Sequence, residues 1–408
     1  MPNPTITRLQ FEDEQLAEIQ CPKRMMRISR GLGSGLAYSP DGRLFAIGDR
    51  GPNLKAKLAV ETYGLEGVRA HGARGSAKVM PALEIGPALA KLRLDGDRVE
   101  LVRTAALHGE DGKPLTGLPP PGSDNSRMEP AVNIDGTPHA PDPGGVDSEG
   151  IAAAGDGTIW IGDEYGPSLL QIDDSGKVRV RWVAAGTEAT MAGAPYPTEA
   201  VLPGLAARRH VNRGFEAIAV SDDGSQLHLA FQSPLAHPDL DAHAAARHVR
   251  LWTLDSASGA LIAQYLYELD EPASFGRDVA QGPVQRDDIK VSEMLCVVGE
   301  RLLILERASQ TTKLYLVELG DGFAIPTPHA EEATRPTVEQ LSAAGDLDLP
   351  VLEKRLLLNT DDHPEIGADL EGMALIDPST LLLVNDNDFG IEDVETAFWR
   401  VRFDEPIG

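Results

Sequence analysis

The stretch from Asp147 to Pro167, "DSEGIAAAGDGTIWIGDEYGP", decides the fold. Its two short apolar runs are separated by an Asp-Gly turn, which is the sequence signature of a β-hairpin. The runs "SLLQIDDSG" and "KVRVRWVA" follow directly. Residues 149–184 therefore predict an antiparallel meander of four strands. Carboxylates stand at both ends of the hairpin. If the same arrangement recurs along the chain, these carboxylates are candidates for a shared site.

The same order of runs returns in other parts of the chain. Later copies begin with "FEAIAVSDDG" at Phe215, "SEMLCVVG" at Ser292 and "EGMALIDPST" at Glu371, and the earliest copy begins with "SGLAYSPDG" at Ser34. Repetition of a four-stranded antiparallel unit is typical of a β-propeller. The sequence predicts an all-β propeller of five such blades with long loop insertions. A sixth blade stays open as an alternative in the long segment before Gly145.

The ends of the chain offer a way to close the ring. The last copy lacks an outermost strand, and residues 5–13, "TITRLQFED", could supply it. Closure would remove the exposed sheet edges that favour aggregation. We therefore expect one propeller domain over residues 1–408, with a long inserted loop at about 104–145. Such a loop is either a linker or a lid over one face of the ring.

Composition limits the partners. Lys and Arg number 37 against 63 Asp and Glu, a formal charge of -26, which repels nucleic acid and anionic membranes and suits a cation. Cys21 and Cys296 form no zinc-binding pattern. No run approaches the roughly 18 apolar residues of a membrane span. Residues 1–20 have neither the basic start nor the apolar core that is typical of a signal peptide. We expect a cytoplasmic protein, or a periplasmic or secreted one if a signal has been removed.

Acidic residues recur at one place in the repeat. In four of the five units a Glu starts the first run, with Ser34 in the first unit, and a second polar residue ends the second run. In a propeller the first strand of each blade lines the channel, and the second strand is antiparallel to it. Both positions therefore reach the same mouth of the channel. They are Glu149, Glu216, Glu293 and Glu371, followed by Asp49, Glu164, Gln232, Glu306 and Asp386.

Carboxylates this close cannot all ionise without compensation. A hard divalent cation is one solution, because calcium takes six to eight oxygen ligands, whereas zinc or copper would call for His or Cys. The alternative is that the acids pair with Arg50, Arg213 and Arg307 or cap turns. The predicted Ca²⁺ ligands are Glu149, Glu216, Glu293, Glu371, Glu164, Asp49 and Asp386.

Several strings resemble one known family. "DSEGIA…IWIGDEYGP", "KVSEML…LLILERAS" and "LEGMALIDPSTLLLVNDNDFG" are similar to the phytase-like β-propeller proteins described as having esterase-like activity of phytase, and the resemblance spans roughly Gly33 to Phe403. It implies a propeller that hydrolyses phosphate esters with bound calcium. The chain departs from the calcium-dependent alkaline phytases, whose phosphate pocket is strongly basic, because its Arg and Lys are scattered.

The resemblance supplies no catalytic residue, but the ring of acids allows a metal-assisted mechanism. Calcium would neutralise phosphate oxygens and activate a water molecule, with Glu164 or Glu293 as the base. Arg50, Arg307 and Lys290 are the candidates for binding the phosphate of a small-molecule ester. Whether the protein is an enzyme stays open at this point. The alternatives are a non-catalytic propeller with a structural calcium that binds a protein or a carbohydrate, and a calcium-dependent lactonase.

Overall fold

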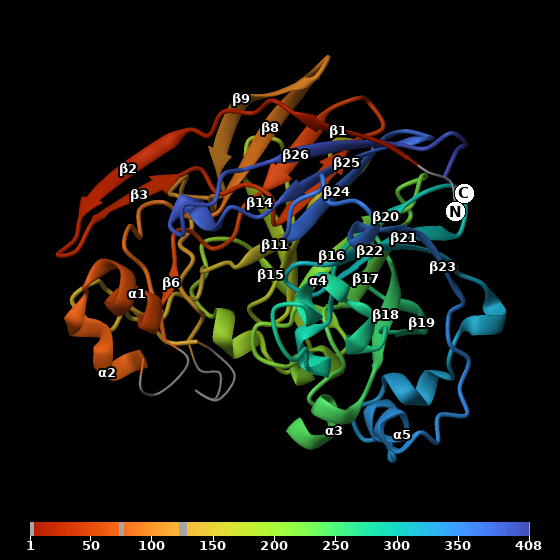
Figure 1. Ribbon diagram of the computed structural model, residues 1–408. Coiled ribbons are helices and arrows are strands. Elements are labelled where there is room, and N and C mark those ends of the chain that lie inside the picture. The colour runs from red at the N-terminus through yellow and green to blue at the C-terminus, as the bar shows by residue number, and fades with distance from the viewer. Residues whose placement is uncertain (1–3, 73–76, 122–128, 408) are drawn as a thin grey trace.

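The computed structural model describes residues 4–72, 77–121 and 129–407. Five four-stranded antiparallel sheets dominate this part of the chain (Figure 1). The first three blades are β4 (Gly35–Tyr38), β5 (Leu44–Ile47), β8 (Ala88–Asp95) and β9 (Arg98–Ala106); β11 (Ser148–Ala153), β12 (Ile159–Asp163), β13 (Ser168–Ile172) and β14 (Val178–Ala184); and β16 (Phe215–Val220), β17 (Gln226–Phe231), β18 (His248–Asp255) and β19 (Leu261–Glu268). The last two are β20 (Lys290–Cys296), β21 (Arg301–Arg307), β22 (Thr312–Glu318) and β23 (Lys354–Asn359); and β24 (Leu370–Asp377), β25 (Thr380–Asn385), β26 (Phe398–Arg402) and β1 (Thr5–Leu9).

The first strands of the blades form a closed ring. β4 contacts β11, β11 contacts β16, β16 contacts β20, β20 contacts β24, and β24 contacts β4. Glycine lets these strands approach closely, since a Cβ on Gly150 would meet the Glu216 carbonyl oxygen at 1.8 Å. The prediction of a five-bladed all-β propeller is confirmed. The described residues between β9 and β11 contain one short strand, β10 (Ala131–Val132), and no sixth blade.

Both chain ends meet in the last blade. β1 pairs antiparallel with β26, from Thr5 opposite Arg402 to Leu9 opposite Phe398. The Phe11 ring then packs edge-on against Phe398, at 5.1 Å between centroids. Figure 1 shows the two termini side by side. In the second blade, β15 (Thr198–Leu202) adds a fifth strand parallel to β14.

A small lobe stands beside the ring (Figure 1). It comprises the hairpin of β2 (Gln15–Gln20) and β3 (Met25–Ser29), the short strands β6 (Leu54–Lys55), β7 (Lys78–Val79) and β10, and the helices α1 (Ala56–Tyr63) and α2 (Arg69–Gly72). Tyr63, Met26 and Phe389 are buried together in its core. α1 ends at Gly64, whose φ of 74° is the left-handed conformation that suits glycine. The segment expected as a linker or lid thus contributes β10 to a folded lobe.

The remaining helices are short additions to loops: α3 (Leu240–Ala245), α4 (Gly276–Val279) and α5 (Val338–Ala344). α5 begins at Thr337, whose side chain accepts a hydrogen bond from the Gln340 N–H in a capping box. Its Glu339 forms a buried ion pair with Arg250 of the third blade at 2.7 Å. This pair fixes the insertion to the ring.

Candidate functional site

A cavity of about 490 Å³ lies at the end of the channel where the first strands begin. Its lining is strongly charged and carries both signs. The acids are Asp49, Glu129, Glu149, Glu216, Asp288, Asp369, Glu371, Asp386, Asp388 and Glu392, and the bases are Arg50, Lys55, Lys78, Arg213, Lys290 and Arg307. We call this cavity the mouth. Lys55, Lys78 and Glu129 come from the lobe, which therefore forms one wall of the mouth.

β-Bulges bring three of the predicted glutamates to the mouth. The strand registers shift at Glu149 in β11, at Glu216 in β16 and at Glu371 in β24, so each of these residues is the extra one of a bulge. A bulge re-aims the side chain of the extra residue. All three glutamates line the mouth and are nearly fully buried.

The fourth blade departs from this pattern. Its bulge residue is Ser292, and Glu293 stands one position later. Because successive side chains of a strand point to opposite faces, one position is enough to take Glu293 away from the mouth. Its fully buried carboxylate accepts hydrogen bonds from the N–H groups of Leu36, at 3.2 Å, and Met294, at 2.9 Å. The structure thus does not bring Glu293 together with the other predicted ligands.

The same offset applies to the second strand of the fourth blade. Arg307, and not Glu306, stands opposite Lys290 and reaches the mouth. Glu306 faces another cluster, where it accepts hydrogen bonds from the Tyr267 hydroxyl at 2.6 Å and from the Lys354 amine at 2.9 Å. The fourth blade therefore presents two bases where the second blade presents acids.

These bases form a cationic side of the mouth together with Arg213. Arg307 pairs with Glu371 and, at 2.5 Å, with Asp369 of the fifth blade. The side chain of Lys290 makes no hydrogen bond or ion pair with another described residue. Burial, and then the charge of Arg307, lowers the pKa of Lys290 to about 8. Lys290 is therefore the base of this side with the most freedom to contact a ligand.

The opposite side carries a compact acidic group. Carboxylate oxygens of Asp49, Asp147 and Glu149 all lie within 4.8 Å of one another. Burial, together with the neighbouring carboxylates, raises the pKa of Glu149 well above its usual value. Burial does the same for Asp147, although the charge of Arg50 acts in the opposite direction. Burial also disfavours ionisation of Asp49, but the charges of Arg50 and Lys78 and the hydrogen bonds of Asp49 together outweigh burial, and the pKa of Asp49 falls to about 2.

Arg50 compensates part of this charge. Its guanidinium lies 2.5 Å from Asp147 Oδ2, 3.0 Å from Asp49 Oδ1 and 3.3 Å from Glu129 Oε2. Only 3% of its surface is exposed. Arg50 was a candidate for substrate binding, and the structure places it within a network of acids instead. One guanidinium among several carboxylates leaves the group net negative.

Two further predicted residues lie at the edge of this group. Glu164 lines a small adjoining cavity, and its Oε1 accepts a hydrogen bond from the Gln232 amide. Burial, and then the charge of Glu216, raises the pKa of Glu164 to about 7. Asp386 lines the mouth itself, and burial together with Asp388 raises its pKa well above the usual value.

Buried carboxylate oxygens without hydrogen-bond partners mark the same place. They are Asp147 Oδ1, Glu164 Oε2 and Glu216 Oε2. Such atoms cost free energy when they are buried, and a bound cation would satisfy them. Oxygen donors alone, gathered at this spacing, fit a hard divalent cation such as calcium. The residues present therefore fit the group that the sequence implied.

Backbone strain is concentrated at the mouth. Five non-glycine residues of the described chain have positive φ, and three of them line this cavity: Asn212 at 55°, Asp369 at 56° and Asp388 at 46°. Asn and Asp tolerate this conformation at some cost. Strain of this kind is typically kept at functional sites.

Several residues of the mouth and of the acidic group beside it were missed from the sequence. Asp147 precedes β11 and lies opposite Glu164, whose N–H binds the Asp147 carbonyl. Its counterpart Asp369 lies opposite Asp386 in the fifth blade. The recurrence of an acid two residues before the bulge glutamate was the available signal. Lys78 and Glu129, in contrast, come from insertions that are not part of the repeated unit, so no pattern in the sequence indicated them.

Comparison with known proteins identifies the family. A family model described as phytase-like, esterase-like activity of phytase, matches residues 29–389. The chain belongs to this phytase-like family. An uncharacterized secreted protein of Arthroderma benhamiae is 29% identical over 228 residues, which are 48% of this chain and 40% of the relative. The aligned part thus spans less than half of that relative's length.

Solved structures resemble the phytase-like chain more distantly. A PQQ-bound aldose sugar dehydrogenase of Streptomyces coelicolor is 12% identical, with 98% of this chain and 99% of that chain covered and a TM-score of 0.34. A putative gluconolactonase is 11% identical, with 98% and 92% covered and a TM-score of 0.34. Similarity of this degree does not identify a substrate. No helix among the described residues is long and apolar enough to cross a membrane.

Proposed function

We propose that this phytase-like protein is a calcium-dependent hydrolase of phosphate esters that acts at the mouth of the channel. The observation that carries the proposal is the separation of charge across one cavity. Asp49, Asp147 and Glu149 gather oxygens on one side, and Lys290 and Arg307 stand on the other. A divalent cation with an anionic ester beside it would satisfy both sides.

Residues of the acidic side would hold the metal. Asp49, Asp147 and Glu149 are the proposed ligands, and Glu216 is close enough to raise the pKa of Glu149. When bound, calcium supplies neutralisation of phosphate oxygens and makes water easier to deprotonate. A cation there would also offset the repulsion that now raises the pKa of Asp147 and Glu149.

The chain's own residues would do the rest. Lys290 would donate hydrogen bonds to the phosphate from the cationic side, and Arg213 adds positive charge near it. Glu164 is the proposed base, because a pKa of about 7 allows it to accept a proton near neutral pH. Glu293 has no part in this proposal, since its carboxylate is enclosed by strand backbone.

A location outside the cytoplasm fits this proposal. Calcium sites in extracellular modules bind weakly because calcium is plentiful there. The relative from Arthroderma benhamiae is described as secreted. Export of the protein is part of this proposal.

A hydrolysis screen tests the function. p-Nitrophenyl phosphate, phytate, p-nitrophenyl butyrate and a γ-lactone are each incubated with the protein in calcium and in EGTA. We expect turnover of the phosphate esters in calcium alone, and a fall of about 100-fold in kcat for Glu164→Gln. Turnover of the lactone alone would instead favour the lactonase. No turnover in any condition would favour the binding module with a structural ion.

A further inference from the structure

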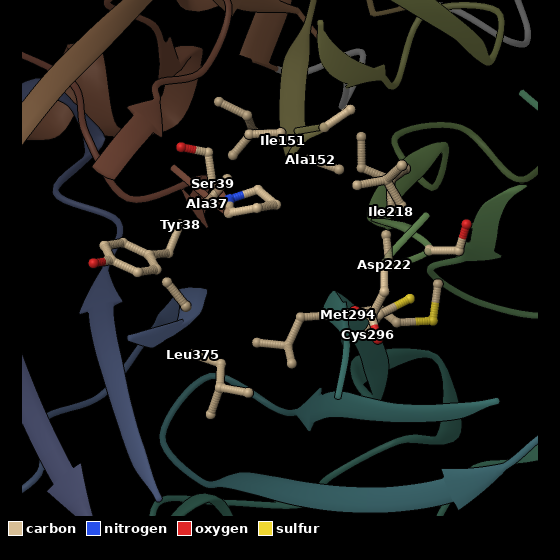
Figure 2. Close-up of a pocket in the computed structure, with 18 of the residues that line it drawn as sticks. Ala37, Tyr38, Ser39, Ile151, Ala152, Ile218, Asp222, Met294, Cys296 and Leu375 are labelled. Atoms are coloured by element: carbon tan, nitrogen blue, oxygen red, sulfur yellow. The ribbon is translucent and has the colours of Figure 1, made fainter. Parts of the chain in front are cut away.

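A second cavity, of about 300 Å³, lies at the opposite end of the channel. It is lined by the last residues of the five first strands and by the turns that follow them. Figure 2 shows Ile151, Ile218, Met294 and Leu375 around an open space. Most of the side chains that line it are apolar, and Ser39, Ser221 and Asp222 add polar groups. We call it the apolar cavity, and its size is within the range of small-molecule sites.

Glu293 separates the two cavities. Its carboxylate binds the N–H groups of Leu36 and Met294, and both of these residues line the apolar cavity. On the other side, Glu216 lines the mouth, and its charge adds to the burial that raises the pKa of Glu293. A ligand of the apolar cavity would therefore not contact the proposed metal ligands.

A groove of about 560 Å³ adjoins the apolar cavity, and Tyr38 lines both. The Tyr38 ring is directed away from the open space in Figure 2. Apolar side chains of Leu44, Leu94 and Val102 continue the lining, and Val102 is 50% exposed. An apolar surface thus runs from the channel to the outside of the first blade.

The charged residues of this groove are all basic: Arg43, Lys91 and Arg93. Arg43 pairs with Asp41 at 2.8 Å, and Arg93 pairs with Glu100. The side chain of Lys91 in β8 makes no hydrogen bond or ion pair with another described residue. Acids beside the groove thus balance two of its three bases, and Lys91 is the uncompensated one. It would attract an anion that the rest of the surface repels.

We propose that the apolar cavity and this groove together bind a straight-chain fatty acid, with its alkyl chain in the cavity and its carboxylate at Lys91. Removal of each methylene from water supplies binding free energy, and an ammonium group is a suitable donor to a carboxylate. Without a basic residue, an apolar site would bind an alcohol of the same length more tightly than the fatty acid, because nothing would compensate the charge of the carboxylate. The uncompensated charge of Lys91 decides for the acid.

Calorimetry with decanoate, decanol and decylamine tests this site. The titrations are done in EGTA, so that the result does not depend on calcium or on hydrolysis. We expect decanoate to bind more tightly than the other two. Lys91→Gln should weaken decanoate binding about fivefold, since a partly exposed charge pair contributes modestly. Leu375→Trp, which places a ring at the cavity wall, should abolish it.

Lys57→Gln is the matched control, because Lys57 is an exposed residue of α1 outside both cavities. It should bind decanoate as the unaltered protein does. Circular dichroism shows whether each variant is folded. No binding of decanoate by the unaltered protein, or unchanged binding by folded Leu375→Trp, would overturn the site. Equal binding of decanoate and decylamine would overturn the role of Lys91.

Discussion

Lys290 and Arg307 stand opposite each other in the β20–β21 ladder of the fourth blade. At the equivalent place the second blade has Asp147 opposite Glu164, and the fifth has Asp369 opposite Asp386. The same pair of facing positions in the repeat thus carries two bases in the fourth blade and two acids in each of the second and fifth blades. The mouth has a cationic and an anionic side because of this exchange.

Lys290→Met should weaken binding of a phosphate ester. The substitution keeps most of the apolar stem and removes the amine, which pairs with no other group of the described residues. We expect KM to rise about tenfold with a smaller change in kcat, because the amine binds the phosphate in both the ground state and the transition state. Steady-state kinetics in calcium measure both constants. Lys57→Met is the control, and an unchanged KM in Lys290→Met would exclude Lys290 from the substrate site.

Glu164 should make the metal-free protein less stable as the pH rises. Its pKa is about 7 in the folded protein and near 4.5 when unfolded, so the folded state holds the proton more tightly. This contribution to stability is full below the unfolded value and is lost as the pH rises through about 7. Thermal unfolding in EGTA from pH 5 to 8 should therefore show the unaltered protein losing stability relative to Glu164→Gln. Parallel curves for the two proteins would contradict the raised pKa.

The N-terminal strand should matter for stability. Deletion of residues 1–14 removes β1 and leaves the edge of β26 unpaired. It also removes Asp13, whose carboxylate accepts hydrogen bonds from Thr396. We expect Tm to fall by about 10 °C or more, whereas removal of residues 1–4 should have little effect. Equal Tm values for the two deletions would show that the ring does not depend on this strand.

The fold was predictable because the repeat is long and regular. Each blade is marked by apolar runs with Asp-Gly or similar turns, and five copies allow one architecture. The lobe was not predictable, since it is assembled from segments far apart in the chain. Tyr63 of α1 donates a hydrogen bond to the Ile391 carbonyl, a contact that no local pattern indicates.

The acidic positions of the site were predictable, but the fourth blade was not. "VSEML" offers both Ser292 and Glu293 for the bulge position, and sequence alternation cannot be followed through a bulge. The prediction put Glu293 at the bulge position. With that register, Glu306 was expected at the mouth, where the structure has Arg307. Three-dimensional pairing decides the register, because Lys290 is opposite Arg307.

Calcium binding at Asp49, Asp147 and Glu149 is the central claim. Glu149→Gln removes one carboxylate from this group, and the Glu149 side chain makes no hydrogen bond with another described residue. Glu371→Gln is the matched control, since Glu371 holds the equivalent bulge position but is neutralised by Arg307. Both substitutions keep the size of the side chain, so both variants should fold.

Calorimetric titration with calcium at pH 8 tests the claim directly. The unaltered protein should bind calcium, Glu149→Gln should bind it about tenfold more weakly or worse, and Glu371→Gln should remain close to the unaltered protein. Absence of calcium binding by the unaltered protein, or equal affinity in Glu149→Gln, would contradict the account.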